Sequence, residues 1–335
     1  MSQQSNLFSP SAFRPAPWLP GGHAQTIFAP LMRAWPRPLT DRERWELPDG
    51  DFVDVDRLRG DSSSRAPALL VLHGLEGSAR SSYIRGMLAQ ARRRGLRGYA
   101  LNFRSCSDEP NRLLRSYHSG ETGDLDEAVR RLLPELGGAP LGIAGFSLGG
   151  NVLVKWLGEQ GDRLPAQVRA AVAVSVPFDL ALCAANLDGE GAMRKIYRTR
   201  FLRTLKRKAL SKARVFAGKL DQARVRRAAT LGEFDEAVTA PVHGFAGAAD
   251  YWARCSSGPF LPRVRVPLLL LSAIDDPIVP ASCLPRNATA ENPAVTLEVS
   301  AHGGHVGFVA GPPWRPRFWA EERAASFLEG LLRQA

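Results

Sequence analysis

The stretch Gly145-Phe146-Ser147-Leu148-Gly149 decides the fold prediction for this chain. It follows the apolar run 141–144 and opens a second apolar run, 148–157, whose composition suits a helix. A G-x-S-x-G pattern between a buried strand and a helix is typical of a nucleophile elbow, a strained turn that exposes a serine hydroxyl at the end of a sheet. We therefore expect Ser147 to be a nucleophile. The alternative is an ordinary glycine-rich turn.

A serine nucleophile on such a turn needs a histidine base that follows it in the sequence. Two of the six histidines, His302 and His305, lie in the glycine-rich segment 301–308, just after the strand-like run 295–299. Glycines let a loop turn tightly enough to direct an imidazole back to the serine. We predict His305 as the general base. His302 is the alternative, and its default role is that of a loop residue.

A triad of this kind also needs an acid that orients the histidine. We expect this acid between Ser147 and the histidine in the sequence, at the end of the strand that precedes the run 295–299. The apolar run 267–273 has the composition of a buried parallel strand, and it ends in Ile274-Asp275-Asp276-Pro277-Ile278-Val279-Pro280. Asp276 stands in the D-x-I-V-P spacing common to such acids, and we predict that it orients the imidazole. Asp275 is the alternative, and a turn carboxylate is its other interpretation.

The oxyanion hole is predicted from a third strand end. The apolar run 68–72 is followed by His73-Gly74-Leu75-Glu76-Gly77, and an H-G pair in this place shapes a loop that donates one backbone N–H. The second donor is the residue after the nucleophile. We predict the amides of Leu75 and Leu148 as the two donors and a structural role for His73.

Composition sets further limits. A chain of 335 residues can bury one large core. It contains no apolar run long enough for a transmembrane helix, and residues 1–6 lack the features of a signal peptide. No pattern calls for a metal or a cofactor. Four scattered cysteines without metal-binding spacing predict free thiols in a reducing cytoplasm: Cys106, Cys183, Cys255 and Cys283.

Strand-like and helix-like segments alternate along the chain, which predicts a doubly wound, mostly parallel sheet of the α/β-hydrolase fold. Residues 1–60 are expected to be an N-terminal extension with leading strands packed on the core, and residues 61–335 the hydrolase domain. A helical cap insertion is expected at about 178–260. The predicted strands are 45–47, 52–57, 68–72, 97–103, 141–144, 170–176, 267–273 and 295–299, and the predicted helices include 82–94, 124–136 and 316–332.

Within the expected cap, residues 194–227 contain fourteen Lys and Arg against one acid, Asp221. Their net charge of +13 exceeds the +11 of the whole chain. One interpretation is a cap helix with a solvated cationic face. A second is contact with an anionic surface, such as lipid headgroups, or with a phosphorylated substrate. Nucleic-acid binding is not expected, because no base-reading module accompanies the charge.

Longer motifs reach beyond the predicted site. They are Trp18-Leu19-Pro20-Gly21-Gly22-His23-Ala24-Gln25-Thr26-Ile27, Asn102-Phe103-Arg104-Ser105-Cys106-Ser107-Asp108-Glu109-Pro110-Asn111 and Tyr117-His118-Ser119-Gly120-Glu121-Thr122. Together with the site motifs, they resemble the YheT-like branch of the α/β-hydrolases, which is related to the α/β-hydrolase-domain lipases. Ser105, where a glycine is usual, and Gly123 depart from the pattern. We expect structural roles for His23 and His118, and an ion pair of Arg104 with Glu121 or Asp124.

The resemblance implies a Ser147–Asp276–His305 triad in a single hydrolase domain that acts on esters. We therefore expect a serine hydrolase that cleaves carboxylic esters, with short- or medium-chain acyl groups or lipids, through an acyl-enzyme. Its partner would be a small-molecule or lipid ester. Two alternatives remain: an alcohol O-acyltransferase with the same triad, and a non-catalytic lipid- or anion-binding protein on a hydrolase scaffold.

Overall fold

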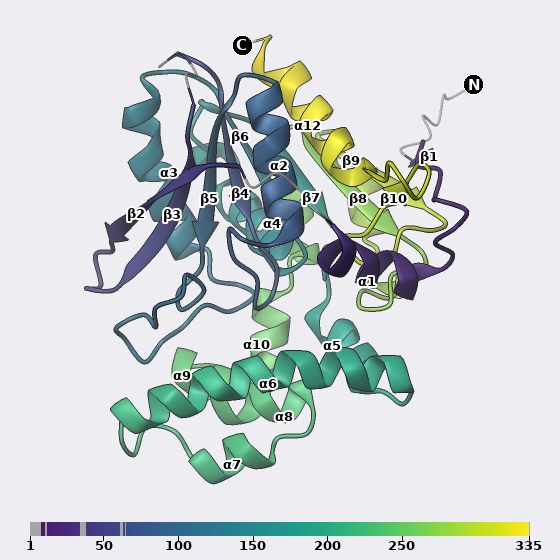
Figure 1. The fold of residues 1–335 in the computed structure, drawn as a ribbon. Helices are drawn as coiled ribbons and strands as arrows, with labels where there is room; N and C mark the ends of the chain where they lie inside the picture. The colour runs from purple at the N-terminus through teal and green to yellow at the C-terminus, as the bar shows by residue number, and fades with distance from the viewer. Residues whose placement is uncertain (1–7, 11, 34–37, 61–62, 64, 335) are drawn as a thin grey trace.

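A nine-stranded sheet forms the centre of the molecule (Figure 1). The computed structural model describes residues 8–334, apart from 11, 34–37, 61–62 and 64. Within these residues the strand order is β1-β9-β8-β7-β6-β4-β5-β3-β2. The strands are β1 Phe8–Pro10, β2 Thr40–Glu46, β3 Phe52–Leu58, β4 Ala68–Leu72, β5 Arg97–Asn102, β6 Leu141–Phe146, β7 Val168–Val174, β8 Leu268–Ala273 and β9 Val295–Ser300.

The sheet is parallel except where β3 pairs with β2 and with β5. Strands β4, β6 and β8 are buried along their whole length. Such strands are covered on both faces, which is why their sequences are continuous apolar runs. The predicted doubly wound, mostly parallel sheet of the α/β-hydrolase fold is confirmed.

Helices cover both faces of the sheet, because successive side chains of a strand point to opposite sides. Leu69 and Val71 of β4 pack with the helices α2 (Ser82–Arg93) and α12 (Trp319–Leu332). Leu70 and Leu72 pack with α3 (Gly123–Leu136) and α4 (Leu148–Gln160). The helix α1 (Gly22–Met32) lies near the lower end of α2 in Figure 1.

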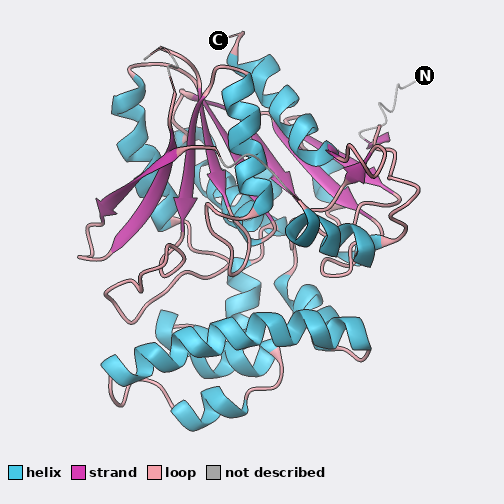
Figure 2. Cartoon of the chain, viewed as in Figure 1, coloured by secondary structure: helices cyan, strands magenta, loops and turns pink. Residues whose placement is uncertain are grey.

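A separate group of helices lies between β7 and β8 in the sequence and beyond the carboxyl ends of the strands (Figure 2). It occupies the segment for which a cap is expected. Its members are α5 Leu180–Asp188, α6 Ala192–Val215, α7 Gln222–Arg227, α8 Leu231–Phe234, a π-helix Asp235–Thr239, α9 Ala240–His243 and α10 Ala248–Cys255. The helix α6 contains most of the basic segment. None of the described helices combines the length and the apolar character needed to cross a membrane.

Several predicted boundaries were wrong. The strand predicted to begin at Trp45 begins at Thr40, because its pairing with β3 continues to Leu58. The last helix begins at Trp319 rather than Pro316, because β11 (Arg317–Phe318) first pairs with β10 (Val309–Ala310). A short helix, α11 (Arg286–Ala290), precedes β9. Residues 1–6, which carry the signal-peptide prediction, lie outside the described residues.

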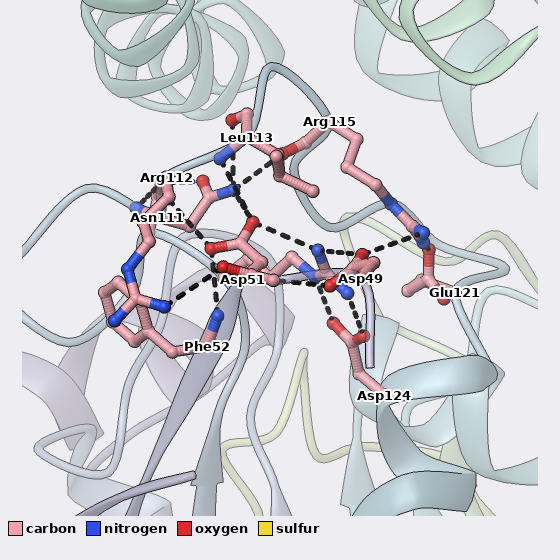
Figure 3. Close-up of polar contacts among 12 residues, drawn as sticks. Asp49, Asp51, Phe52, Asn111, Arg112, Leu113, Arg115, Glu121 and Asp124 are labelled. Carbon is pink, nitrogen blue, oxygen red and sulfur yellow. Dashed lines mark hydrogen bonds and ion pairs between the residues drawn. The ribbon is translucent and has the colours of Figure 1, made fainter. Parts of the chain in front are cut away.

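A buried arginine ties the β2–β3 turn to the loop after β5 and to the start of α3. Arg104 is 3% exposed, and its guanidinium donates to Asp124 at 2.7 and 2.8 Å, to Asp49 at 2.8 Å and to Asp51 at 3.0 Å. Figure 3 shows the side chains of Asp49, Asp51 and Asp124 pointing toward this guanidinium. Of the two predicted partners of Arg104, Asp124 is confirmed. Glu121 instead forms an ion pair with Arg115.

Candidate active site

Ser147 lies on the turn between β6 and α4 with a φ of +53°. Positive φ is strained for a residue with a Cβ. The neighbouring glycines are required by close packing: a Cβ on Gly145 would lie 2.5 Å from the carbonyl oxygen of Gly149, and a Cβ on Gly149 would lie 2.5 Å from that of His73. The turn therefore has the geometry of a nucleophile elbow.

The loops after β8 and β9 bring a histidine and an aspartate to this serine. His305 Nε2 lies 2.9 Å from Ser147 Oγ, and His305 Nδ1 lies 2.8 Å from Asp276 Oδ2. The other carboxylate oxygen of Asp276 accepts the backbone N–H groups of Ile278 and Val279 at 2.8 and 2.9 Å. These two bonds fix the carboxylate so that its second oxygen faces the imidazole.

The two alternative candidates pair with each other. His302 Nδ1 lies 3.3 Å from Asp275 Oδ2, and the His302 side chain is 58% exposed. The other oxygen of Asp275 accepts the N–H of Gly304 at 2.9 Å, which supports the loop that carries His305. The structure thus brings Asp276 and His305, and not Asp275 and His302, to Ser147.

The N-terminal helix α1 packs against the His305 loop. Thr26 Oγ1 accepts the N–H of His305 at 2.8 Å. A Cβ on Gly304 would lie 2.3 Å from the carbonyl oxygen of Gly22, so the loop and the helix are in direct contact. Gln25 is fully buried, and its side-chain oxygen accepts the N–H of Val309. Sequence reasoning missed these supports, although the motif 18–27 was the signal for them.

The predicted oxyanion loop lies beside the nucleophile. Gly77 N–H bonds to Gly74 O at 3.0 Å, and a Cβ on Gly74 would lie 3.1 Å from Ser147 Cβ. Leu75 and Leu148 line the same cavity as Ser147. Neither of their backbone N–H groups has an acceptor within the part of the chain that the structure describes. Both amides are therefore available to a developing oxyanion.

His73 joins the loop 73–77 to the end of β5. Its Nε2 accepts the N–H of Phe103 at 3.1 Å, so Nδ1 carries the proton and donates to Gly74 O at 2.8 Å. Burial lowers the pKa of His73 to about 4, which keeps the ring neutral. The contacts agree with the predicted structural role.

A cavity of about 170 Å³ extends from Ser147 into the helices between β7 and β8. Much of its wall is apolar and is formed by Leu180, Leu187, Phe201, Leu205, Leu231, Phe234, Val238 and Ile278. Polar groups also reach it, among them Lys208 and Lys212 of α6. A mostly apolar cavity with few polar groups is the usual form of a small-molecule site.

Two further histidines also line this cavity. His118 and His243, together with Glu121, form the group of described residues whose ligand atoms lie close enough to hold a metal, within 4.8 Å of one another. However, Arg115 already neutralises Glu121, and the N–H of Gly120 bonds to His118 Nδ1 at 3.1 Å. These contacts occupy Glu121 and the Nδ1 atom of His118. The predicted structural role of His118 is compatible with them. His23 Nδ1 likewise contacts Tyr197 Oη at 3.1 Å.

Comparison with known proteins identifies the family. The family model described as "alpha/beta hydrolase fold" matches residues 67–312. The chain belongs to the α/β-hydrolase fold family. It is 39% identical to "Putative esterase YheT" of Escherichia coli over 98% of this chain and 96% of that protein. It is 29% identical to "Phospholipase ABHD3" of Homo sapiens over 96% and 78%. The resemblance to the YheT-like branch is thereby confirmed.

Solved structures agree on the fold. The esterase Pf2001 of Pyrococcus furiosus superposes with a TM-score of 0.57, covering 91% of this chain and 97% of that one. Its sequence identity to this chain is 17%, so this likeness concerns the fold alone. The site must be argued from the residues of this chain.

Proposed function

We propose that the protein is a serine hydrolase of carboxylic esters with Ser147, His305 and Asp276 as its catalytic triad. The observation that carries the proposal is the continuous contact from Ser147 Oγ through the two ring nitrogens of His305 to Asp276, with distances of 2.9 and 2.8 Å. Nucleophile, base and orienting acid are recognised by this geometry rather than by their sequence positions.

The mechanism follows from the positions of these groups. Ser147 Oγ attacks the ester carbonyl while His305 Nε2 takes its proton. Asp276 holds the imidazole with Nδ1 protonated and stabilises the imidazolium. The amides of Leu75 and Leu148 bind the oxyanion. His305 then protonates the leaving alcohol, and a water molecule activated by the same imidazole releases the acid from the acyl-enzyme.

The substrate class is inferred from the cavity wall and from the relatives. An apolar lining next to Ser147 suits an acyl chain. The names of the relatives include an esterase and a phospholipase. We therefore propose short- or medium-chain esters or lipid esters as substrates.

The test is covalent labelling with a fluorophosphonate probe, followed by turnover of p-nitrophenyl esters of increasing chain length. Wild type should react, whereas Ser147→Ala and His305→Ala should not. The preferred chain length would then measure the acyl site. A folded wild-type protein that neither labels nor turns over any ester would contradict the proposal and favour a non-catalytic binding protein. Added ethanol tests the acyltransferase alternative, because ester formation in place of acid would reveal transfer to an alcohol.

The outer face of α6 supports a second part of the proposal, contact with an anionic lipid surface. Its exposed cations have no carboxylate partner among the described residues: Lys195, Arg200, Arg203, Arg207 and Arg214. Elsewhere in the protein, exposed arginines commonly form ion pairs with carboxylates, as in Arg59–Asp41 and Arg130–Asp126. Apolar side chains are exposed near both ends of the helix, Ile196 by 55% and Val215 by 73%. Unpaired cations along the helix, with an exposed apolar side chain near each end, suit an anionic membrane surface.

Vesicle co-sedimentation tests this contact. The protein should bind vesicles that contain phosphatidylglycerol, bind pure phosphatidylcholine less, and lose binding as salt is raised. Binding to duplex DNA with the same salt dependence would instead support a general polyanion surface. Failure to bind either would leave α6 as a solvated cap helix.

A further inference from the structure

Glu76 adopts a backbone conformation that is unfavourable for a residue with a side chain. The turn Gly74–Gly77 is closed by the bond from Gly77 N–H to Gly74 O, and Glu76 is its third residue, with a φ of +54°. Glycine or asparagine normally occupies the third position of a turn when φ is positive there, because other side chains crowd the backbone. The structure around Glu76 must therefore compensate for this strain.

Tyr117 holds Glu76 at two points. Its hydroxyl accepts the backbone N–H of Glu76 at 2.7 Å and donates to the Glu76 carboxylate at 2.8 Å. The tyrosine ring is buried and stacks on Phe103, with centroids 5.5 Å apart and planes 6° from parallel. One hydroxyl on a fixed ring thus sets both the backbone and the side chain of Glu76.

Lys208 of α6 adds a third contact to Glu76. Its Nζ lies 2.8 Å from the same carboxylate oxygen of Glu76, although 132 positions separate the two residues. Both side chains are largely shielded from solvent. Burial opposes the charge of Lys208, but the neighbouring Cys106 and Glu76 raise its pKa above the ordinary value. The ammonium ion therefore persists and ties α6 to the turn.

We propose that Tyr117 and Lys208 are positioning residues that hold the Gly74–Gly77 turn so that the amide of Leu75 faces the oxyanion beside Ser147. The Leu75 N–H belongs to the Gly74–Leu75 peptide, between the carbonyl of Gly74, which accepts the Gly77 N–H, and the Glu76 N–H, which Tyr117 holds. Restraining the turn on both sides of this peptide limits the directions in which the Leu75 N–H can point. The Lys208–Glu76 ion pair couples the placement of α6 to the assembly of the oxyanion hole. The inference rests on the proposed ester hydrolysis, because the Leu75 amide has an oxyanion to bind only if that reaction takes place.

The kinetic test compares three substitutions on α6 with a p-nitrophenyl ester. Lys208→Met should lower kcat roughly 10- to 100-fold with little change in KM, since misplacing a stabilising group costs rate on this scale. Lys208→Arg should restore most of the loss. Lys206→Met is the matched control. Lys206 lies on the same helix, but its Nζ bonds to the carbonyl oxygen of Arg226 rather than to Glu76, so this substitution should leave turnover unchanged. An unchanged kcat in Lys208→Met would overturn the inference, as would an effect confined to KM, which would indicate direct contact with substrate.

A second variant reaches the same turn without removing a charge. Tyr117→Phe keeps the stacked ring and deletes the hydroxyl that bonds to Glu76. Like Lys208→Met, it should lower kcat with little change in KM. Loss of rate in only one of the two variants would contradict a shared positioning role. This comparison also guards against a fold defect in either single variant.

Amide hydrogen exchange gives a readout that does not depend on turnover. In the free protein, Lys208→Met and Tyr117→Phe should speed exchange in the segment 72–82, roughly tenfold or more, whereas Lys206→Met should not. Unchanged exchange would overturn the inference. Faster exchange in a protein whose wild type neither labels nor turns over ester would uphold the role of Tyr117 and Lys208 in holding the turn, while refuting the proposed function.

Discussion

Thr26 Oγ1 accepts a hydrogen bond of 2.8 Å from the backbone N–H of His305, although 279 positions separate the two residues. The threonine hydroxyl gives its own proton to Gly22 O, one turn earlier in α1, at 2.6 Å. Its oxygen therefore presents a lone pair to the loop. The N-terminal helix thus helps to fix the histidine on which the proposed mechanism depends.

Thr26→Val should lower kcat roughly tenfold with little change in KM. The substitution keeps the shape of the side chain and leaves the N–H of His305 without an acceptor, so the loop can shift by a fraction of an ångström. Steady-state kinetics with a p-nitrophenyl ester gives the answer. Thr26→Ser, which keeps the hydroxyl, is the control and should remain near wild type. Equal rates for Val and Ser variants would mean that this bond does not position the base.

The two neighbouring aspartates should differ sharply. Asp276→Asn would replace the group that holds His305 in the required tautomer, and we expect kcat to fall by about four orders of magnitude. Asp275→Asn should cost no more than a few-fold, because the asparagine oxygen can still accept the Gly304 N–H that supports the His305 loop. The lost pair with His302 is exposed, and such surface pairs contribute little. Labelling rates with the fluorophosphonate probe should follow the same order. The reverse order would reassign the acid.

The central sheet and the triad candidates were predictable because each signal is local. A buried parallel strand is a continuous apolar run, and β6 and β8 end directly at Ser147 and near Asp276. The carboxyl ends of adjacent parallel strands lie at one edge of the sheet. Candidates at those ends were therefore expected to meet, and the structure brings them together.

The supporting contacts could not be predicted in the same way, because they join segments far apart in the chain. Nothing in the sequence around Thr26 specifies His305 as its partner. The basic segment gives a second example: Lys212 turns inward and donates to the carbonyl oxygens of Asn111 and Leu113, whereas Arg203 and Arg207 face outward. Charge alone does not distinguish these environments. Only the packing of α6 against the core does.

Two glycine substitutions should have opposite effects on stability. Both sites lie in helices, where alanine is intrinsically preferred over glycine by roughly 0.5 to 1 kcal/mol. Gly330 in α12 has no atom within 4 Å of the added Cβ, so Gly330→Ala should gain about that amount. At Gly149 the added Cβ would lie 2.5 Å from His73 O and 2.7 Å from Leu72 O. Gly149→Ala should therefore lose about 1 to 3 kcal/mol. Urea unfolding measures both changes, and a stabilised Gly149→Ala would refute the packing argument.

Asp235 should make stability depend on pH. It opens the π-helix, lines the cavity and accepts hydrogen bonds from Thr239 Oγ1 at 2.7 Å and Trp252 Nε1 at 2.9 Å. Burial raises its pKa from 3.8 to about 6. Between these values the folded protein binds more protons than the unfolded chain, so this group's contribution to stability falls as pH rises from about 4 to 6.

Asp235→Asn should therefore be more stable than wild type at pH 8 and similar to it near pH 4. An asparagine stays neutral, can accept from Trp252 and can donate to Thr239. The gain should be on the order of 1 kcal/mol, less than the full pKa shift implies, because the cavity leaves Asp235 only half-buried. Urea unfolding at the two pH values measures it. Asp250→Asn is the opposite control: hydrogen bonding from the Ala246 N–H lowers the pKa of Asp250, so its contribution is present at pH 8 and is lost on acidification. If Asp235→Asn changed stability equally at both pH values, the titration of Asp235 would not be the cause.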